Sequence, residues 1–316
     1  MWSDIWNQAF MVSLFAGMIT IATPLLFGAM GELVTERSGI MNLGIEGNML
    51  IGAFAGFLTT HATHSLWLGV VVAALAASIS GLLMAFMSTT LKVDQTVTGL
   101  AINLLASGMT FYLYRVAFKN VGSANLPSIP TFRAVRIPLL SNIPVIGRIL
   151  FVHHALTFIA VILVPLIGYF LYRTRYGLEI RLMGENPRAA DMRGINVTLR
   201  QYAAVVFGAM MAGVGGSFLT LASAGLFVPN ISSGRGFIAF ALVIFGNWSP
   251  ARILAGAMFF GLIDALQLQL QAIGVQHVPH QLLLALPYVL TIVVLLGNRR
   301  RTRAPMALAL PYVREG

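Results

Sequence analysis

Apolar runs about as long as a bilayer is thick recur along almost the whole chain, separated by short polar segments. A helix needs about 20 apolar residues to cross a hydrocarbon core of about 30 Å. The pattern predicts an all-α, polytopic membrane helix bundle of about nine spans (eight to ten) in a single transmembrane domain over residues 1–316. The predicted spans are residues 8–31, 41–58, 67–90, 95–116, 152–172, 200–222, 235–247, 251–271 and 281–297.

Two of these spans differ from the others. Residues 41–58 begin with a polar stretch, and residues 235–247 cover only about half of a membrane. Helices that end at membrane depth are tolerated only where their ends face protein or a water-filled cavity. Both segments are therefore the places where we expect a path through the membrane.

Small residues recur at a spacing of four within the spans. Gly52 and Gly56 form one such pair, and Gly208, Ala212 and Gly216 continue the pattern in a later span. Lipid provides no hydrophobic drive between helices, so close backbone approach must supply the packing. We interpret these positions as ordinary helix contacts.

Composition supports a membrane protein. Hydrophobic residues make up 58% of the chain and charged residues only 9%, which is too few to cover a water-soluble surface. The chain has no cysteine, which excludes disulfides and metal-thiolate sites. A net charge of +10 would suggest nucleic acid as a partner of a soluble protein, but in a membrane protein it is typical of arginine-rich cytoplasmic loops.

The basic segments predict the orientation. The loop at 173–200 and the C-terminal tail at 298–316 are rich in arginine, so we expect both in the cytoplasm. Counting spans backward places the loop at 117–150 and the N-terminus outside. The outer loop carries basic residues of its own, which locally opposes the rule.

Motifs of hydrolytic enzymes do not occur. A phosphate-binding loop needs G-x-x-x-x-G-K-[ST], and neither Lys92 nor Lys119 stands in that context. The patterns H-E-x-x-H and G-x-S-x-G are also absent. We therefore expect no catalytic residue, no bound cofactor and no metal site in this chain, and any ATP hydrolysis that drives it must take place on another subunit.

Two acidic residues fall within predicted spans, Glu46 near the start of one and Asp264 inside another. Burying a charge in a bilayer is costly, so such residues are functional candidates. Two isolated acids make a poor proton relay, however. We interpret Asp264 as a structural residue that bonds Gln267 or Asn247.

The basic loop at 173–200 also predicts a short helix outside the membrane, at about residues 187–193. It carries the residues typical of a helix start and stop, namely Asn186 as N-cap, Pro187 in the first turn and Gly194 at the end. A solvated loop would explain the charge but not a capped helix with Ala189 and Ala190 exposed. A docking helix for a cytoplasmic partner explains both.

Three stretches place glycine, acidic and amide residues in apolar surroundings. They are GELVTERSGIMNLGIEGNMLIGA at 31–53, YGLEIRLMGENPRAADMRGIN at 176–196 and GRGFIAFALVIFGNWSP at 234–250. In these stretches, which occur in the expected order, the chain resembles the permeases of bacterial ABC importers for branched-chain amino acids, simple sugars and nucleosides. The segment ERSGIMNLGIEG is most similar to the nucleoside-type branch.

The resemblance implies the membrane-spanning subunit of an importer in the bacterial inner membrane, forming the translocation path for nucleosides. Simple sugars and branched-chain amino acids are the alternatives. The implied partners are a second homologous permease (in a homo- or heterodimer), a cytoplasmic ABC ATPase that binds ATP and Mg²⁺, an extracytoplasmic binding protein and membrane lipid, with no nucleic acid.

The resemblance also implies two sets of functional residues. The coupling helix that docks on the ATPase would comprise Glu185, Asn186, Pro187, Arg188, Ala189, Ala190, Asp191, Arg193 and Gly194. The translocation path would include Asn42, Glu46, Asn48, Asn103 and Phe237, whose aromatic face suits a nucleobase.

Two other classes of protein fit the sequence less well. An ion-coupled secondary transporter predicts intramembrane charges in series and no docking helix, and the sequence shows the opposite. A membrane enzyme predicts histidines and acids clustered at one membrane face, which the sequence does not contain.

Overall fold

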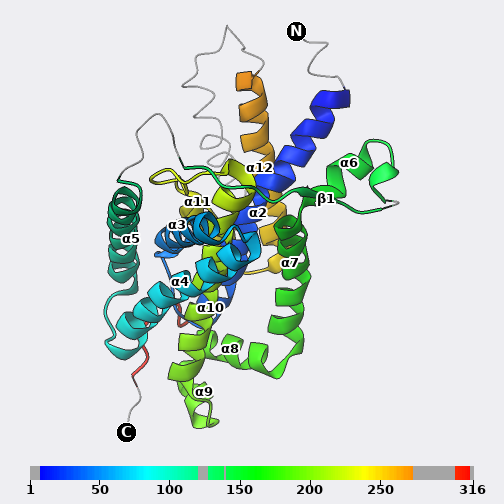
Figure 1. The fold of residues 1–316 in the computed structure, drawn as a ribbon. Helices are drawn as coiled ribbons and strands as arrows, with labels where there is room; N and C mark the ends of the chain where they lie inside the picture. The colour runs from blue at the N-terminus through cyan, green and yellow to red at the C-terminus, as the bar shows by residue number, and fades with distance from the viewer. Residues whose placement is uncertain (1–7, 120–126, 139, 273–302, 314–316) are drawn as a thin grey trace.

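The computed structural model describes residues 8–119, 127–138, 140–272 and 303–313 as an almost entirely helical bundle (Figure 1). Within these ranges, six helices are long and apolar enough to cross a membrane. They are α2 (Gln8–Arg37), α4 (Leu66–Ala85) with the π-helical turn Phe86–Thr90, α5 (Gln95–Ala117), α7 (Ala155–Arg173), α10 (Val197–Phe218) with the π-helical turn Leu219–Ala224, and α12 (Pro250–Ala272).

The remaining elements are shorter or more polar. They are α3 (Ile45–Thr63), α6 (Ile146–Leu150), α8 (Arg175–Glu185), α9 (Pro187–Met192), α11 (Arg235–Phe245), a 3₁₀ turn (Leu140–Asn142) and the antiparallel strands β1 (Ala134–Arg136) and β2 (Val152–His154).

This architecture confirms the predicted polytopic helical bundle. The two atypical spans are α3 and α11, which are indeed the ones outside the set of six. The prediction was wrong at several boundaries, most of all in the first two spans: α2 runs to Arg37 instead of ending at residue 31, and α3 runs from Ile45 to Thr63 instead of from 41 to 58. The predicted span at 281–297 lies outside the described residues.

Helix α10 lies inside the bundle and packs on α2, α3 and α4. Its contacts use the predicted small residues: a Cβ atom on Gly216 would overlap the backbone of Met49 in α3, and one on Gly52 would overlap the backbone of Gly213. Such close approach lets backbones supply the van der Waals contact that lipid cannot replace. The small-residue spacing is therefore a packing feature, as the sequence suggested.

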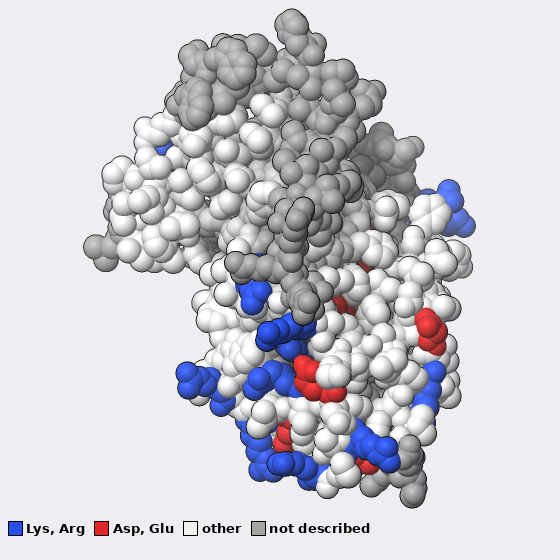
Figure 2. Space-filling model, turned by 180° about the vertical axis from the view of Figure 1, so that it is seen from behind, with Lys and Arg blue, Asp and Glu red and all other residues white. Residues whose placement is uncertain are grey.

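The two ends of the bundle differ in charge. The arginine-rich end, defined here by residues 173–200 and 303–313, lies opposite the first residues of α2 (Figure 1). Most of the visible Lys and Arg side chains gather over this end (Figure 2). The basic loop and the C-terminal tail thus share one end of the molecule, as the orientation argument requires.

At the opposite end, residues 127–138 contact the π-helical turn that follows α10. Ile129 donates its backbone N–H to the carbonyl of Gly225 at 2.8 Å, and Phe132 donates to that of Leu221 at 2.9 Å. His153 bonds the carbonyl oxygen of Ile149 at 2.6 Å, and burial lowers the pKa of its imidazole. These contacts give His153 a structural role.

We predict that Gly216→Ala destabilises the protein, because the added Cβ meets backbone atoms that cannot rotate away. Overpacking of this kind typically costs about 1–3 kcal/mol. The matched control is Gly108→Ala in α5, where a Cβ meets nothing within 4 Å. Thermal unfolding of the detergent-purified proteins should show a lower Tm for Gly216→Ala alone, and equal Tm values would contradict the packing described here.

Candidate functional site

Helix α11 is a half-length helix inside the protein. Its 11 residues span about 16 Å, roughly half of a hydrocarbon core. Its first turn meets the first turn of α3, where a Cβ on Gly236 would overlap the backbone of Glu46. The half-length α11 and α3, which follows a non-helical segment, therefore begin beside each other within the bundle; helix ends at membrane depth form binding sites in many transporters.

Glu46 occupies the N-terminus of α11. Its carboxylate accepts hydrogen bonds from the backbone N–H groups of Gly234 at 2.8 Å and Gly236 at 2.6 Å, and from the hydroxyl of Ser232 at 2.6 Å. The Glu46 residue is only 7% exposed. The unpaired N–H groups and the positive end of the helix dipole stabilise a buried anion at this place.

The other end of α11 is also fixed by residues of the 31–53 stretch. The indole N–H of Trp248 donates to the carboxylate of Glu36 at 2.5 Å, and Glu36 is fully buried. The guanidinium of Arg37 donates to the carbonyl of Trp248 at 2.9 Å. An anion at the first turn of α11 and a cation beyond its last turn both suit the helix dipole.

The segment between α2 and α3 is not helical, and side chains satisfy its backbone. Asn42 donates its backbone N–H to Glu32 at 2.9 Å, and Met41 donates to the side-chain oxygen of Gln95 at 2.7 Å. Asn103 accepts from the N–H of Gly47 at 2.7 Å and donates to a carbonyl of the same segment at 2.8 Å. Non-helical backbone within a membrane requires such partners.

The structure brings together three of the five predicted path residues. Asn42, Glu46 and Asn103 surround the break before α3, and the side chain of each bonds at least one backbone group there. Asn48 instead faces α4, where its amide oxygen accepts from the hydroxyl of Ser80. Phe237 on α11 is 42% exposed. The role of all five residues in translocation stays a prediction.

Sequence reasoning missed several residues of this site. Glu32, Glu36 and Trp248 lie in the stretches that carried the family resemblance, yet ending the first span at residue 31 left both acids outside it. Gln95 could not be singled out from the sequence, because it is a single polar residue at the start of α5 and lies outside those stretches.

Asp264 lies on α12 close enough to Arg235 of α11 for their charges to interact. The predicted partner Asn247 is occupied elsewhere, since its side-chain oxygen accepts the backbone N–H of Arg303 at 2.8 Å. Asp264 thus lies within the influence of the Arg235 charge, and its predicted bond to Gln267 or Asn247 stays a prediction.

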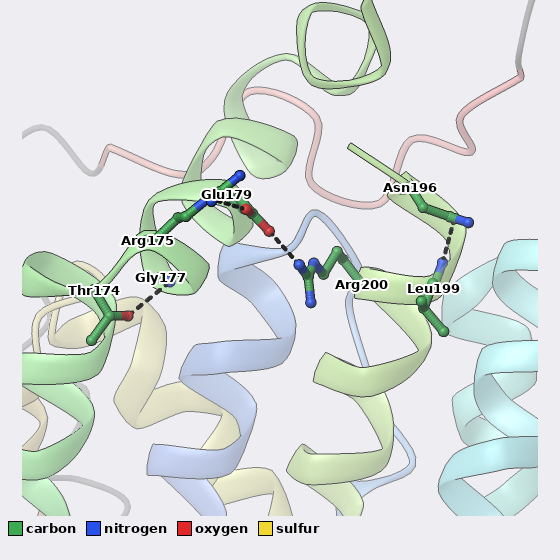
Figure 3. A network of polar contacts seen from close by, with 7 residues as sticks. All are labelled: Thr174, Arg175, Gly177, Glu179, Asn196, Leu199 and Arg200. Atoms are coloured by element: carbon green, nitrogen blue, oxygen red, sulfur yellow. Dashed lines mark hydrogen bonds and ion pairs between the residues drawn. The ribbon is translucent and has the colours of Figure 1, made fainter. Parts of the chain in front are cut away.

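A polar network fixes the arginine-rich end to the bundle (Figure 3). Glu179 of α8 forms ion pairs with Arg200 of α10 at 2.7 Å and with Arg175 at 3.4 Å. Thr174 caps α8 through the N–H of Gly177, and Asn196 caps α10 in the same way. Displacing α8 would therefore also act on the first turn of α10.

The short helix expected in the basic loop is present as α9, ending at Met192. Asn186 accepts the N–H of Ala189 at 3.0 Å, Pro187 opens the first turn and Gly194 has a φ of 77°. Of the predicted docking residues, the exposed ones are Glu185, Asn186, Arg188, Arg193 and Gly194, while Pro187, Ala189 and Asp191 are half-buried.

One expectation for α9 was wrong. Ala190 is fully buried in the core of the protein, with 0% exposure, because the turn after α9 folds back over it: the N–H of Ile195 donates to the carbonyl of Ala190 at 3.2 Å. Met192, which the sequence did not single out, is instead 78% exposed. A partner would therefore touch Met192 and the polar positions rather than Ala190.

Comparison with known proteins shows which family the chain matches. The family described as branched-chain amino acid transport system / permease component matches residues 14–295. The chain is 36% identical to the putative glucose ABC transporter permease TsgC13 of Haloferax volcanii, over 98% of this chain and 99% of the relative. It is also 36% identical to the nucleoside ABC transporter permease NupC of Lactococcus lactis, over 95% and 96% of the two chains, and to the guanosine ABC transporter permease NupQ of Bacillus subtilis, over 94% and 95%. NupP, another guanosine permease of Bacillus subtilis, is 24% identical over 86% of this chain.

We predict that Glu46→Gln weakens the attachment of α11 to α3. The neutral amide loses the charge-assisted bonds and turns an N–H donor toward other donors, and hydrogen bonds to charged groups contribute about 1.5–3 kcal/mol each. The matched control is Glu185→Gln at an exposed position. Thermal unfolding in detergent should show a clear loss of Tm for Glu46→Gln only; an unchanged Tm would mean that the carboxylate does not stabilise α11.

Proposed function

The chain belongs to the branched-chain amino acid transport permease family of ABC transporters, and we propose that it forms the membrane path of a bacterial importer for nucleosides. It is a multi-pass membrane protein and, like its family, a permease rather than an ATPase. The observation that carries the proposal is full-length similarity to permeases named for nucleosides and guanosine, NupC and NupQ.

The relatives are named for more than one class of substrate. The glucose permease TsgC13 is as similar in identity as NupC and NupQ, and the family description names branched-chain amino acids. The segment ERSGIMNLGIEG, at residues 36–47, favours nucleosides because of its resemblance to the nucleoside-type branch. Simple sugars are the second candidate.

Transport would require partners. The chain lacks a phosphate-binding loop, so ATP and Mg²⁺ would bind to a cytoplasmic ATPase that docks on α9. Two permeases named for guanosine in Bacillus subtilis both match this chain, which supports a second, homologous permease in the complex. An extracytoplasmic binding protein would deliver the substrate, and the arginine-rich end would face the cytoplasm of the inner membrane.

The geometry suggests how ATPase movement could reach the path. Force on α9 would pass through α8 to α10 along the Glu179–Arg200 ion pair. A second route would lead to α11 through the end of α2. Arg37 donates to the carbonyl of Trp248, and Glu36 accepts the indole N–H of the same residue, which follows α11. Because α11 is fixed at both ends, a displacement of either end would move Glu46 and the residues beside it, including Phe237.

The proposed activity predicts ATP-dependent uptake. Vesicles that contain this chain with its neighbouring operon products should accumulate labelled uridine and adenosine only when ATP and the binding protein are both present. Ribose, glucose and leucine serve as parallel substrates. Uptake of a sugar or leucine alone would show that the importer carries that compound instead of nucleosides. Uptake driven by an ion gradient without ATP would contradict the proposal that the chain belongs to an ATP-driven importer.

The docking role of α9 predicts that Met192→Glu weakens binding of the ATPase at least tenfold and reduces uptake accordingly. Met192 is 78% exposed, so the change should not affect folding, and an unchanged Tm would verify this. Leu140→Glu at the opposite end is the matched control. ATPase affinity measured on detergent-purified permease should fall for the α9 variant alone, and equal affinities would rule out docking at α9.

A further inference from the structure

The C-terminal segment, residues 303–313, packs across the arginine-rich end. Ala307 donates its N–H to the carbonyl of Gly184 at 2.8 Å, and Ala309 donates to that of Gly39 at 3.1 Å. Ala307 is buried, and Leu308 and Tyr312 pack against the main hydrophobic core. These contacts give the segment a defined place although it is outside the membrane helices.

The same segment contacts α9 and the turn after α11. The hydroxyl of Tyr312 donates to the carboxylate of Asp191 in α9 at 3.0 Å, and the N–H of Arg303 donates to the side chain of Asn247 at 2.8 Å. Gly184 has no room for a side chain, because a Cβ there would overlap the backbone of Arg37 and lie 3.3 Å from Pro305. The C-terminal segment is thus bonded to Gly184 just before α9 and to Asp191 within it.

The outward face of the C-terminal segment is apolar. Met306 is 79% exposed, Leu310 61% and Val313 56%. Tyr312 touches Asp191, the residue before the exposed Met192, so this apolar face continues toward the exposed side of α9. Exposed apolar patches bordered by polar residues mark interaction sites.

The charges around this face decide between occupants. Arg188 and Arg193 are exposed on and just after α9, Arg303 is exposed at the start of the segment, and most of the visible basic side chains lie at this end (Figure 2). Basic side chains beside apolar ones also suit an anionic lipid surface, but the bond from Tyr312 to Asp191 places this face against α9, the proposed docking helix. A protein with an apolar groove and an acidic rim therefore matches its position as well as its chemistry.

From this, and resting on the proposed function, we propose that the C-terminal segment and α9 together form one docking surface for the cytoplasmic ATPase. The bonds from Ala307, Ala309 and Tyr312 fix the segment beside α9. Met306, Leu310 and Val313 then contact an apolar groove of the ATPase, and the arginines contact its acidic rim. A family-type docking helix would thus be only half of the interface.

The test compares single Leu→Glu variants of the full-length permease. Leu310→Glu should weaken binding of the ATPase at least tenfold with an unchanged Tm, because a carboxylate would enter an apolar contact with an acidic border. Leu140→Glu, on the opposite end and 42% exposed, should bind the ATPase as the natural chain does. Equal ATPase affinity for Leu310→Glu and Leu140→Glu would overturn the proposal.

Met192→Glu in the same assay separates this inference from the proposed function. If Met192→Glu weakens binding and Leu310→Glu does not, docking is confined to α9 and the C-terminal segment faces solvent or the membrane surface. If the natural chain fails to bind the ATPase at all, the proposed function itself fails.

Discussion

A carboxylate buried among membrane helices must be neutralised by its surroundings, and this requirement organises the interior of the protein. Glu46 meets it by sitting at the N-terminus of α11, where two backbone N–H groups and a serine hydroxyl converge on its oxygens. The solution requires α11 to begin inside the bundle. Gly236 is needed because a Cβ there would overlap the backbone of Glu46, and Gly234 has a φ of 82°, which favours glycine. The start of α11 inside the bundle is therefore what brings backbone N–H groups to this buried charge.

The break and the half-helix depend in turn on the packing around them. Glycines of α10 bring its backbone against α2, α3 and α4. Side chains of Glu32, Gln95 and Asn103 then supply the hydrogen bonds that a helix would have made. Both ends of α11 are bonded to the 31–53 stretch, and Gly39 of the same stretch accepts a bond from the C-terminal segment.

The sequence was sufficient for features that depend on local patterns. Apolar runs gave the helical bundle, the polar start of one span and the short length of another identified α3 and α11, and Asn186, Pro187 and Gly194 gave the cap, first turn and end of α9. Features that depend on long-range contacts were missed. The chain could not show that Glu46 bonds residues 186 or more positions away, that α2 buries two acids past residue 31, or that Ala190 is covered by its own following turn. In a helix, the partner of a buried polar group can lie anywhere in the sequence, so residue spacing carries no signal for it.

The measurement that would decide whether α11 moves during transport uses the absence of natural cysteine. A single Phe237→Cys substitution places a thiol on the exposed side of α11, and its rate of reaction with a water-soluble thiol reagent can be followed in the complete transporter with and without ATP. We expect the rate to change several-fold when ATP binds, because movement at the arginine-rich end would displace α11 and alter the exposure of position 237. A rate that is the same in both conditions, in a variant that still takes up substrate, would contradict the coupling of α11 to the ATPase.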